Sequence, residues 1–159
     1  MRIVLFEPEI PPNTGNIARL CAASDIALHL IEPLGFSVDN KHLRRAGLDY
    51  WPHVDITVHP DFDDFLTKVQ PSRLVLASAK RGKPLHRFDF HEDDCIVMGP
   101  ETRGLPAEMF DKYPDHVNIP MNPQHVRSLN LSTATGILLY EALRATGGLD
   151  KLHELYYSA

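Results

Sequence analysis

The chain has 159 residues, a net charge of −5 and 43% hydrophobic residues, which is enough for one domain with its own core. This negative charge excludes a general nucleic-acid coat protein, which needs a broad positive field, but it allows a local basic patch. The apolar runs are too short to span a membrane and the N-terminus lacks the apolar region of a signal peptide, so we expect a cytoplasmic protein with no membrane partner.

Short runs that are almost continuously apolar mark the predicted strands. The clearest are residues 3–6, 27–31, 74–77 and 95–98, and weaker candidates are residues 55–59 and 116–121. Helical patterns fall between them, at residues 16–23, 42–48, 61–69, 106–113 and 130–146. Strands that are apolar on both faces and alternate with helices are typical of parallel sheets. We therefore predict a single α/β domain over residues 1–159, with a mostly parallel sheet flanked by helices and an amphipathic tail at residues 149–159.

Ligands of such sheets bind beyond the carboxyl ends of the strands, so the loops that follow the strands are the places to look for a site. The loop "EPEIPPNTGNIAR" follows the first strand. Asn13 or Thr14 can cap the next helix, and Gly15 allows a close backbone approach. Arg19 is then either a surface residue or a cation aimed at a phosphate or ribose.

The loop "MGPETRGLP" follows the strand at residues 95–98. Its closely spaced Gly and Pro residues fix an unusual backbone, on which Glu101 and Arg103 are displayed. Gly99 at the end of the strand would let a ligand approach the main chain. A plain turn requires neither the paired charges nor two glycines, so the loop is a candidate binding element.

The stretch "SLNLSTATGILLYEAL" begins the last long helix with a group of small polar side chains. Asn130 or Ser132 can cap this helix, and Gly147 is placed to end it. Tyr140 is either a core residue or a group near a ligand. Capping explains one side chain but leaves open why the group is so large: Ser128, Asn130, Ser132, Thr133 and Thr135.

Two basic clusters are candidates for phosphate contacts, although each can also be ordinary solvated surface. The first is Lys41, Arg44 and Arg45, and the second is Lys80, Arg81, Lys83 and Arg87. The nine His residues show no metal-ligand spacing, and two distant cysteines give no disulfide framework. We therefore expect no metal.

The segments "PNTGNIAR", "IVMGPETRGLP" and "IPM…SLNLSTATGILLYEAL" resemble, in order, the three motifs of the SPOUT superfamily of RNA methyltransferases. With "LRRAGLDYW" added, the chain is most similar to the small tRNA (cytidine/uridine-2′-O-)-methyltransferases that act on the wobble nucleotide. The segment "SAKRG" is more basic than is typical of that group.

The resemblance implies a C-terminal deep trefoil knot, S-adenosylmethionine as cofactor, tRNA as substrate, and a homodimer whose second subunit completes the active site. The cofactor pocket it implies consists of Ala77, Ser78, Gly99, Ile119, Met121, Ser128 and Leu129. Much of the binding is expected to come from backbone hydrogen bonds.

The resemblance also implies roles for polar residues. Arg19 would stabilise the developing 2′-oxyanion or contact the adjacent phosphate, because a guanidinium is too basic to remove the proton itself. Asn13, Glu101 and Asn130 would orient Arg19 and the ribose, while the general base stays open. The expected RNA contacts are Lys41, Arg44, Arg45 and Tyr140, with core packing as the alternative for Tyr140.

Other functions remain open at this stage. The same 2′-O-methylation can act on another tRNA or ribosomal RNA site. A non-catalytic RNA-binding factor can share the fold, although Arg19, Glu101 and Asn130 are all present in this chain. A small-molecule methyltransferase is a further alternative, and the cluster that contains Arg44 counts against it.

Overall fold

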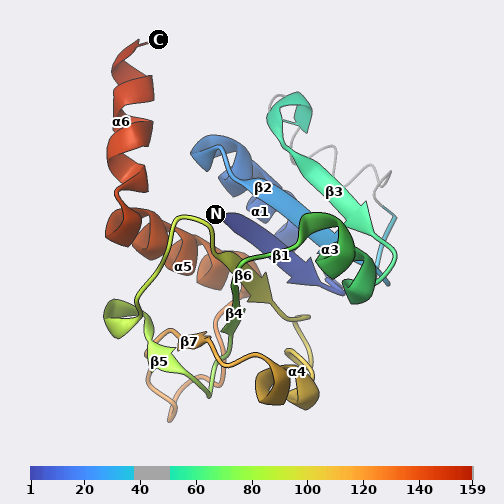
Figure 1. Cartoon of the computed structure of the whole chain (residues 1–159). Coiled ribbons are helices and arrows are strands. Elements are labelled where there is room, and N and C mark those ends of the chain that lie inside the picture. Colours follow the sequence, from blue (N-terminus) through green and yellow to red (C-terminus); the bar gives the residue numbers. More distant parts are fainter. Residues whose placement is uncertain (38–50, 159) are drawn as a thin grey trace.

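The computed structural model describes residues 1–37 and 51–158. Its centre is a seven-stranded sheet in the order β3-β2-β1-β6-β4-β7-β5, in which every recorded strand pair is parallel (Figure 1). The strands are β1 (Arg2–Phe6), β2 (Ala27–Ile31), β3 (Ile56–His59), β4 (Leu74–Ala77), β5 (Lys83–Pro84), β6 (Cys95–Met98) and β7 (His116–Asn118). The predicted α/β class with a largely parallel sheet is confirmed.

Helices cover both faces of this sheet, which is why its central strands β1, β4 and β6 are almost continuously apolar. In β1, Ile3 and Leu5 pack in one core cluster with residues of α1 (Pro11–Ser24) and α5 (Leu131–Thr146). Val4 points the other way, into a cluster with α3 (Phe62–Val69) and α4 (Ala107–Lys112). Successive side chains of a strand alternate between faces, so two covered faces require an unbroken apolar run.

The chain ends in α6 (Gly148–Ser158), which extends beyond the sheet (Figure 1). Gly147 closes α5 in the left-handed conformation, with φ 76°, as its position predicted. The first turns of α6 pack on the core, whereas Tyr156 and Tyr157 near its end are 79% and 75% exposed. Within residues 1–37 and 51–158, no helix is long and apolar enough to cross a membrane.

Several predicted boundaries were wrong. Helix α1 begins at Pro11, five residues before the predicted start, because proline suits the first helical turn. Asn13 and Thr14 therefore lie inside the helix and do not cap it; Ile10 is at the cap position without a side-chain bond. Strand β7 ends at Asn118, earlier than predicted. The short edge strand β5 and the 3₁₀ turns η1 (Trp51–His53) and η2 (Leu85–Arg87) were not predicted. The predicted helix at residues 42–48 lies outside the described residues.

Candidate functional site

A cavity of about 790 Å³ lies beyond the carboxyl ends of β4, β6 and β7 and reaches the loop after β1 and the first turns of α5. This is where the loops after the strands were expected to meet. Its inner wall is apolar and includes Leu105, Val117 and Leu138, which are almost fully buried. The residues that the resemblance assigned to a cofactor all line it: Ala77, Ser78, Gly99, Ile119, Met121, Ser128 and Leu129.

One carboxylate joins the first and second motif loops at this cavity. Glu101 accepts hydrogen bonds from the backbone N–H groups of Glu9 at 2.9 Å and Ile10 at 3.1 Å. It also accepts one from the side-chain amide of Asn13 at 3.0 Å, across 88 residues of sequence. The two N–H groups belong to the residues just before α1, where a helix has no acceptors of its own. Glu101 therefore accepts from the backbone that leads into α1 and fixes it against the second motif loop.

The same network continues into the third motif. The amide nitrogen of Asn130 donates to the side-chain oxygen of Asn13 at 2.9 Å. The oxygen of Asn130 meanwhile accepts from the backbone N–H groups of Ser132 at 2.9 Å and Thr133 at 3.3 Å, so Asn130 is the cap of α5. Asn130 thus binds its own helix with one end of the amide and α1 with the other, and orients the two helix starts toward one cavity.

This arrangement explains most of the small polar side chains at the start of α5. The hydroxyl of Ser132 donates to the oxygen of Asn130 at 2.7 Å. Thr135 is fully buried and donates to the carbonyl of Leu131 one turn earlier, at 2.8 Å. Ser128 stays exposed on the cavity rim. Of the two predicted caps, Asn130 is therefore correct, and the hydroxyl groups of Ser132 and Thr135 bond within the first turns of α5.

The loop after β6 folds back on itself at Gly99. A Cβ atom at Gly99 would lie 2.4 Å from the backbone nitrogen of Leu105 and 2.6 Å from the carbonyl carbon of Gly104. The space beside Gly99 is therefore filled by this loop, which gives a second reason for a glycine here; Gly99 also lines the cavity, so the approach of a ligand to its main chain stays a prediction. Gly104 itself has φ +71°, and its N–H donates to the carbonyl of Pro100 at 3.0 Å.

Two acidic residues of the first loop, missed in the sequence, hold the second motif loop from the other side. Glu9 accepts from the backbone N–H of Thr102 at 3.0 Å and from its hydroxyl at 2.9 Å. Glu7 forms an ion pair with Arg103. Glu9 and Glu101 therefore bind each other's loops reciprocally. The available signal in the sequence was the pair of acidic residues in "EPE" and the charged residues in "ETR". Nothing in the sequence showed that the two loops meet, so these contacts were not predicted.

The remaining predicted residues lie elsewhere. Arg19 is on the exposed side of α1 and is not among the described residues that line the cavity. Tyr140 is 45% exposed on α5 and also does not line the cavity, so core packing within this chain was the wrong alternative for its ring. Lys41, Arg44 and Arg45 lie outside the described residues.

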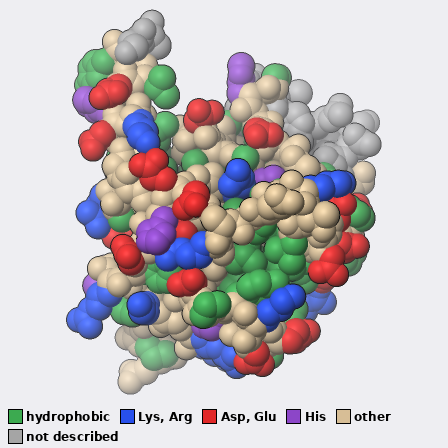
Figure 2. Space-filling view, viewed as in Figure 1, with side chains coloured by type: hydrophobic (Ala, Val, Ile, Leu, Met, Phe, Trp, Pro, Cys, Tyr) green, Lys and Arg blue, Asp and Glu red, His purple; other side chains and the backbone are tan. Residues whose placement is uncertain are grey.

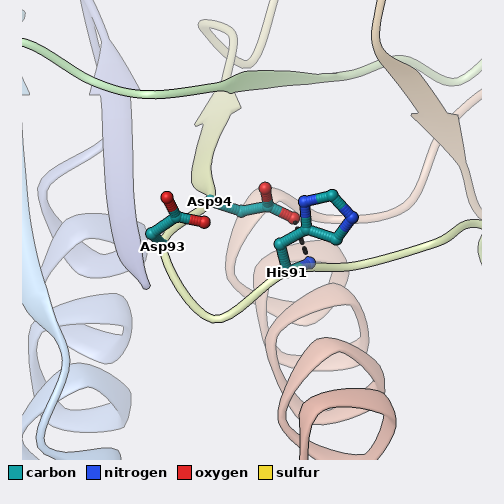
Figure 3. A group of neighbouring side chains, drawn as sticks. All are labelled: His91, Asp93 and Asp94. Carbon is teal, nitrogen blue, oxygen red and sulfur yellow. Dashed lines mark hydrogen bonds between the residues drawn. The ribbon is translucent and has the colours of Figure 1, made fainter.

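Two further polar groups are not part of the cavity. His91, Asp93 and Asp94 have ligand-type atoms within 4.8 Å of one another, which resembles a metal site (Figure 3). However, the fully buried carboxylate of Asp94 accepts from Arg73 at two 2.7 Å contacts and from the backbone N–H of His91 at 2.8 Å. These bonds raise the pKa of Arg73. The cluster is explained as the anchor of one buried ion pair.

The second group is a buried relay on β2, β3 and α3. His29 Nδ1 lies 3.0 Å from His59 Nε2, and His59 Nδ1 lies 2.9 Å from the carboxylate of Asp64. His29 is 7% and His59 is 1% exposed. Burial, reinforced by the neighbouring His59, lowers the pKa of His29 from 6.5 to about 4, so it is neutral at pH 7.

The two cysteines are inert in this fold. Cys21 and Cys95 are both free and buried, in agreement with the absence of a disulfide framework in the sequence. Burial raises the pKa of the Cys21 thiol to about 12 and also raises the pKa of Cys95. Neither thiol is therefore a nucleophile at neutral pH.

A parallel α/β sheet with a cavity of this size beyond its strand ends defines a protein that binds a small molecule at the carboxyl edge of its sheet. The profile of the SpoU rRNA Methylase family matches residues 1–140. The chain belongs to this family, as the resemblance of its three motifs predicted.

Individual relatives agree with this assignment. A protein of Saccharophagus degradans named tRNA (cytidine(34)-2′-O)-methyltransferase is 50% identical over 147 residues, which cover 91% of this chain and 95% of the relative. A structure solved in work on the 2-OH methylation of C/U34 on tRNA is 48% identical, with a TM-score of 0.84 over 91% of this chain and 94% of that one. The methyltransferase AviRb of Streptomyces viridochromogenes, solved with AdoMet, has the same fold at 24% identity, with a TM-score of 0.81 over 91% of this chain and 59% of that chain.

Proposed function

We propose that this protein transfers a methyl group from S-adenosylmethionine to the ribose 2′-hydroxyl of the wobble nucleotide, a cytidine or uridine, of tRNA. The observation that carries the proposal is the bonded series Glu101–Asn13–Asn130, which joins all three methyltransferase motifs at one cavity. The 50% identity to a tRNA (cytidine(34)-2′-O)-methyltransferase over 91% of this chain supports this particular substrate.

The cavity suits S-adenosylmethionine. Its volume of about 790 Å³ lies within the range of small-molecule sites. Buried apolar side chains such as Leu138 form its wall, and the loop backbone around Ser78, Gly99 and Ser128 offers polar groups at the rim. This combination matches a ligand with a flat adenine ring and a polar sugar and amino-acid portion. When bound, the cofactor supplies an electrophilic methyl group on sulfur.

The described side chains at the cavity position the reacting groups. Asn13, Glu101 and Asn130 hold the two helix starts and the second motif loop in one arrangement, which keeps the orientation of a bound ribose fixed during an in-line displacement. Arg19 supplies a cation that stabilises the developing 2′-oxyanion or the neighbouring phosphate. The carboxylate of Glu101 is engaged by three N–H donors, which favours a positioning role for it.

A second copy of the chain is part of this proposal. Arg19 is exposed on α1 and is not among the described residues that line the cavity of its own chain. A homodimer in which Arg19 of each subunit reaches the cavity of the other accounts for this position, and such a pair is most simply arranged around a two-fold axis. The exposed Tyr156 and Tyr157 at the end of α6 offer apolar area for contact between subunits.

The finer features expected from the resemblance complete the proposal. The chain is one domain that acts in the cytoplasm, and its C-terminal part forms a trefoil knot, as the family resemblance implies. Arg44, Arg45 and Lys41 contact tRNA phosphates. The exposed ring of Tyr140 is available to a nucleotide held by the dimer.

The decisive experiment is methyl transfer from labelled S-adenosylmethionine to unmodified and native bulk tRNA, with mapping of the labelled nucleotide. We expect the label on the 2′-oxygen of nucleotide 34, the position in the name of the relative. Label at another tRNA position, or only on ribosomal RNA, would keep the chemistry and replace the substrate. Cofactor binding with label on a small molecule only would favour a small-molecule enzyme. Failure of both transfer and cofactor binding would favour a non-catalytic RNA-binding factor.

A further inference from the structure

The segment 80–87 carries an unusual concentration of positive charge. Four of its eight residues are Lys or Arg and none is acidic, in a chain whose net charge is −5. These residues are exposed, and among residues 1–37 and 51–158 no carboxylate forms an ion pair with any of them: Lys80, Arg81, Lys83 and Arg87. Five other cations of the described residues have carboxylate partners: Lys68, Arg73, Arg103, Arg144 and Lys151. Lys112, which lies over the ring of Tyr113, and Arg127 form no ion pair with the described residues.

The backbone of this segment is held firmly although its side chains are exposed. The hydroxyl of Ser78 accepts from the backbone N–H groups of Lys80 and Arg81, each at 3.1 Å. The carbonyl of Gly82 accepts from the side-chain amide of Asn118 at 2.8 Å. Lys83 then pairs in register with Val117 of β7. A cationic loop fixed in this way loses little entropy when it binds an anion.

Gly82 makes this anchoring possible. Its φ is +101°, and a Cβ atom there would lie 2.4 Å from the carbonyl carbon and oxygen of His116. The guanidinium of Arg81 is held as well, since it lies 5.2 Å from the centre of the Phe110 ring. The stacked guanidinium keeps its N–H donors available at the ring's edge.

The segment lies next to the proposed cofactor cavity. Ser78 and Lys80 line the cavity. Two further lining residues contact the segment: Phe110 lies beneath the guanidinium of Arg81, and Val117 is the strand partner of Lys83. Arg127 also lines the cavity, is exposed, and forms no ion pair with the described residues. In Figure 2, Lys and Arg side chains lie over the lower part of this face, with acidic side chains between them, where Figure 1 places β5 and α4.

We propose that Lys80, Arg81 and Lys83, together with Arg127, form a phosphate-binding strip that holds the backbone of the RNA beside the cavity. The proposal rests on the proposed function, because it assigns the strip to the RNA that would be methylated. One carboxylate of a cofactor neutralises one cation, whereas several unpaired cations in a row match a ligand with repeated negative charges. Such contacts place the RNA relative to the cavity without reading its sequence.

The test compares two double variants with equal loss of charge. Lys80→Ala/Lys83→Ala removes two lysines of the strip, and the matched control Lys68→Ala/Lys151→Ala removes two lysines that are paired with Asp64 and Glu92. The dissociation constant for a tRNA transcript is measured with S-adenosylmethionine present over a series of salt concentrations. Each lost phosphate contact should reduce the slope of log K against log salt by about 0.7–0.9, so we expect a decrease of roughly 1.5 for the strip variant only.

The outcomes separate this proposal from the proposed function. A parallel series uses ribosomal RNA, and calorimetry with S-adenosylmethionine alone reports on the cofactor site and on correct folding. One outcome is that the strip variant lowers the salt slope with ribosomal RNA while the protein does not bind tRNA. This outcome supports the strip and contradicts tRNA as the substrate. Equal slopes for the two double variants overturn the strip, as does a wild-type slope near zero with both RNAs. The strip is also overturned if its variant weakens only cofactor binding.

Discussion

The amide nitrogen of Asn130 lies 2.9 Å from the side-chain oxygen of Asn13, and this hydrogen bond connects the first turns of α5 and α1 across 117 residues of sequence. Because Asn13 donates with its other end to Glu101, the orientation of both amide groups is determined by their partners. The geometry at the cavity therefore depends on the chemical identity of each amide end, and conservative substitutions can test it.

Asn130→Asp and Asn130→Ala separate capping from bridging. Aspartate keeps the cap of α5 but places an acceptor against the buried acceptor of Asn13, so we expect methyl transfer to fall by about tenfold or more and the free energy of unfolding to fall by about 1–3 kcal/mol through the unpaired acceptors alone. Alanine removes both functions and should lower the free energy of unfolding by about 1–2 kcal/mol as well. Urea unfolding and initial transfer rates provide the two readouts. Full activity of the aspartate variant would show that the bridge to Asn13 has no positioning role.

Glu101→Gln tests the acceptor before α1. Glu101 accepts from three N–H groups, and a glutamine would direct an NH₂ group at some of these donors. We expect a loss of about 1–3 kcal/mol in the free energy of unfolding, together with weaker cofactor binding. The control is Glu108→Gln on the exposed side of α4. Equal effects of the two substitutions on unfolding would contradict the structural role of Glu101.

Gly99→Ala tests the close packing of the second motif loop. The added methyl group would meet the backbone of Leu105 and Gly104, which cannot move as a flexible side chain does. We expect a loss of about 1–3 kcal/mol and a weaker cofactor complex. Gly104→Ala is the comparison, since its Cβ would meet no atom within 4 Å and only the positive φ opposes it. If Gly104→Ala lowers the stability in thermal unfolding more than Gly99→Ala does, the close backbone contact at Gly99 does not have the destabilising effect that we expect.

Arg19→Ala should reduce transfer by about 100-fold or more while the Kd for S-adenosylmethionine stays near the wild-type value. A shared active site makes a further prediction. Mixing Arg19→Ala with the cavity variant Ser128→Trp, each inactive alone, should restore about a quarter of the wild-type activity, because half of the dimers are mixed and each has one intact site. Absence of restored activity, with exchange of subunits demonstrated by mass, would place Arg19 outside the partner's cavity.

The buried relay predicts a pH-dependent stability. The folded-state pKa of His29 is about 4, below the unfolded value of 6.5, so the unfolded chain binds this proton more readily. The free energy of unfolding should therefore decrease as the pH falls from 6.5 toward 4, by on the order of 3 kcal/mol in total. Urea unfolding at fixed protein concentration and several pH values measures this decrease. His29→Gln should reduce it, whereas the exposed His125→Gln should leave it unchanged.

Local patterns in the sequence were sufficient for the sheet strands. Residues 74–77 and 95–98 are apolar without interruption, residues 27–31 are apolar except for His29, and each run was predicted with the bounds that β4, β6 and β2 have. Such a run has few alternatives, because a strand covered on both faces is apolar at nearly every position. The cap of α5 by Asn130 and its end at Gly147 are equally local, since each depends on a few neighbouring residues.

Features that depend on distant partners were not predictable. The hydrogen bond from the backbone N–H of Ile10, just before α1, to Glu101 joins groups that lie 91 residues apart. Strand β5 exists because Lys83 and Pro84 meet β7, not because two residues have any strand pattern. The relay of His29, His59 and Asp64 likewise forms only when two strands and a helix come together.

The sequence by itself determined the class of fold, the family and the loops that make the site, because each is encoded in residue patterns short enough to read along the chain. Only the tertiary structure decided that Glu101, Asn13 and Asn130 form one bonded series, and that Gly99 makes room for backbone atoms. It also decided which lysines and arginines have carboxylate partners. These are pairings between groups far apart in sequence, and their geometry exists only after the sheet has brought its strand ends to one edge.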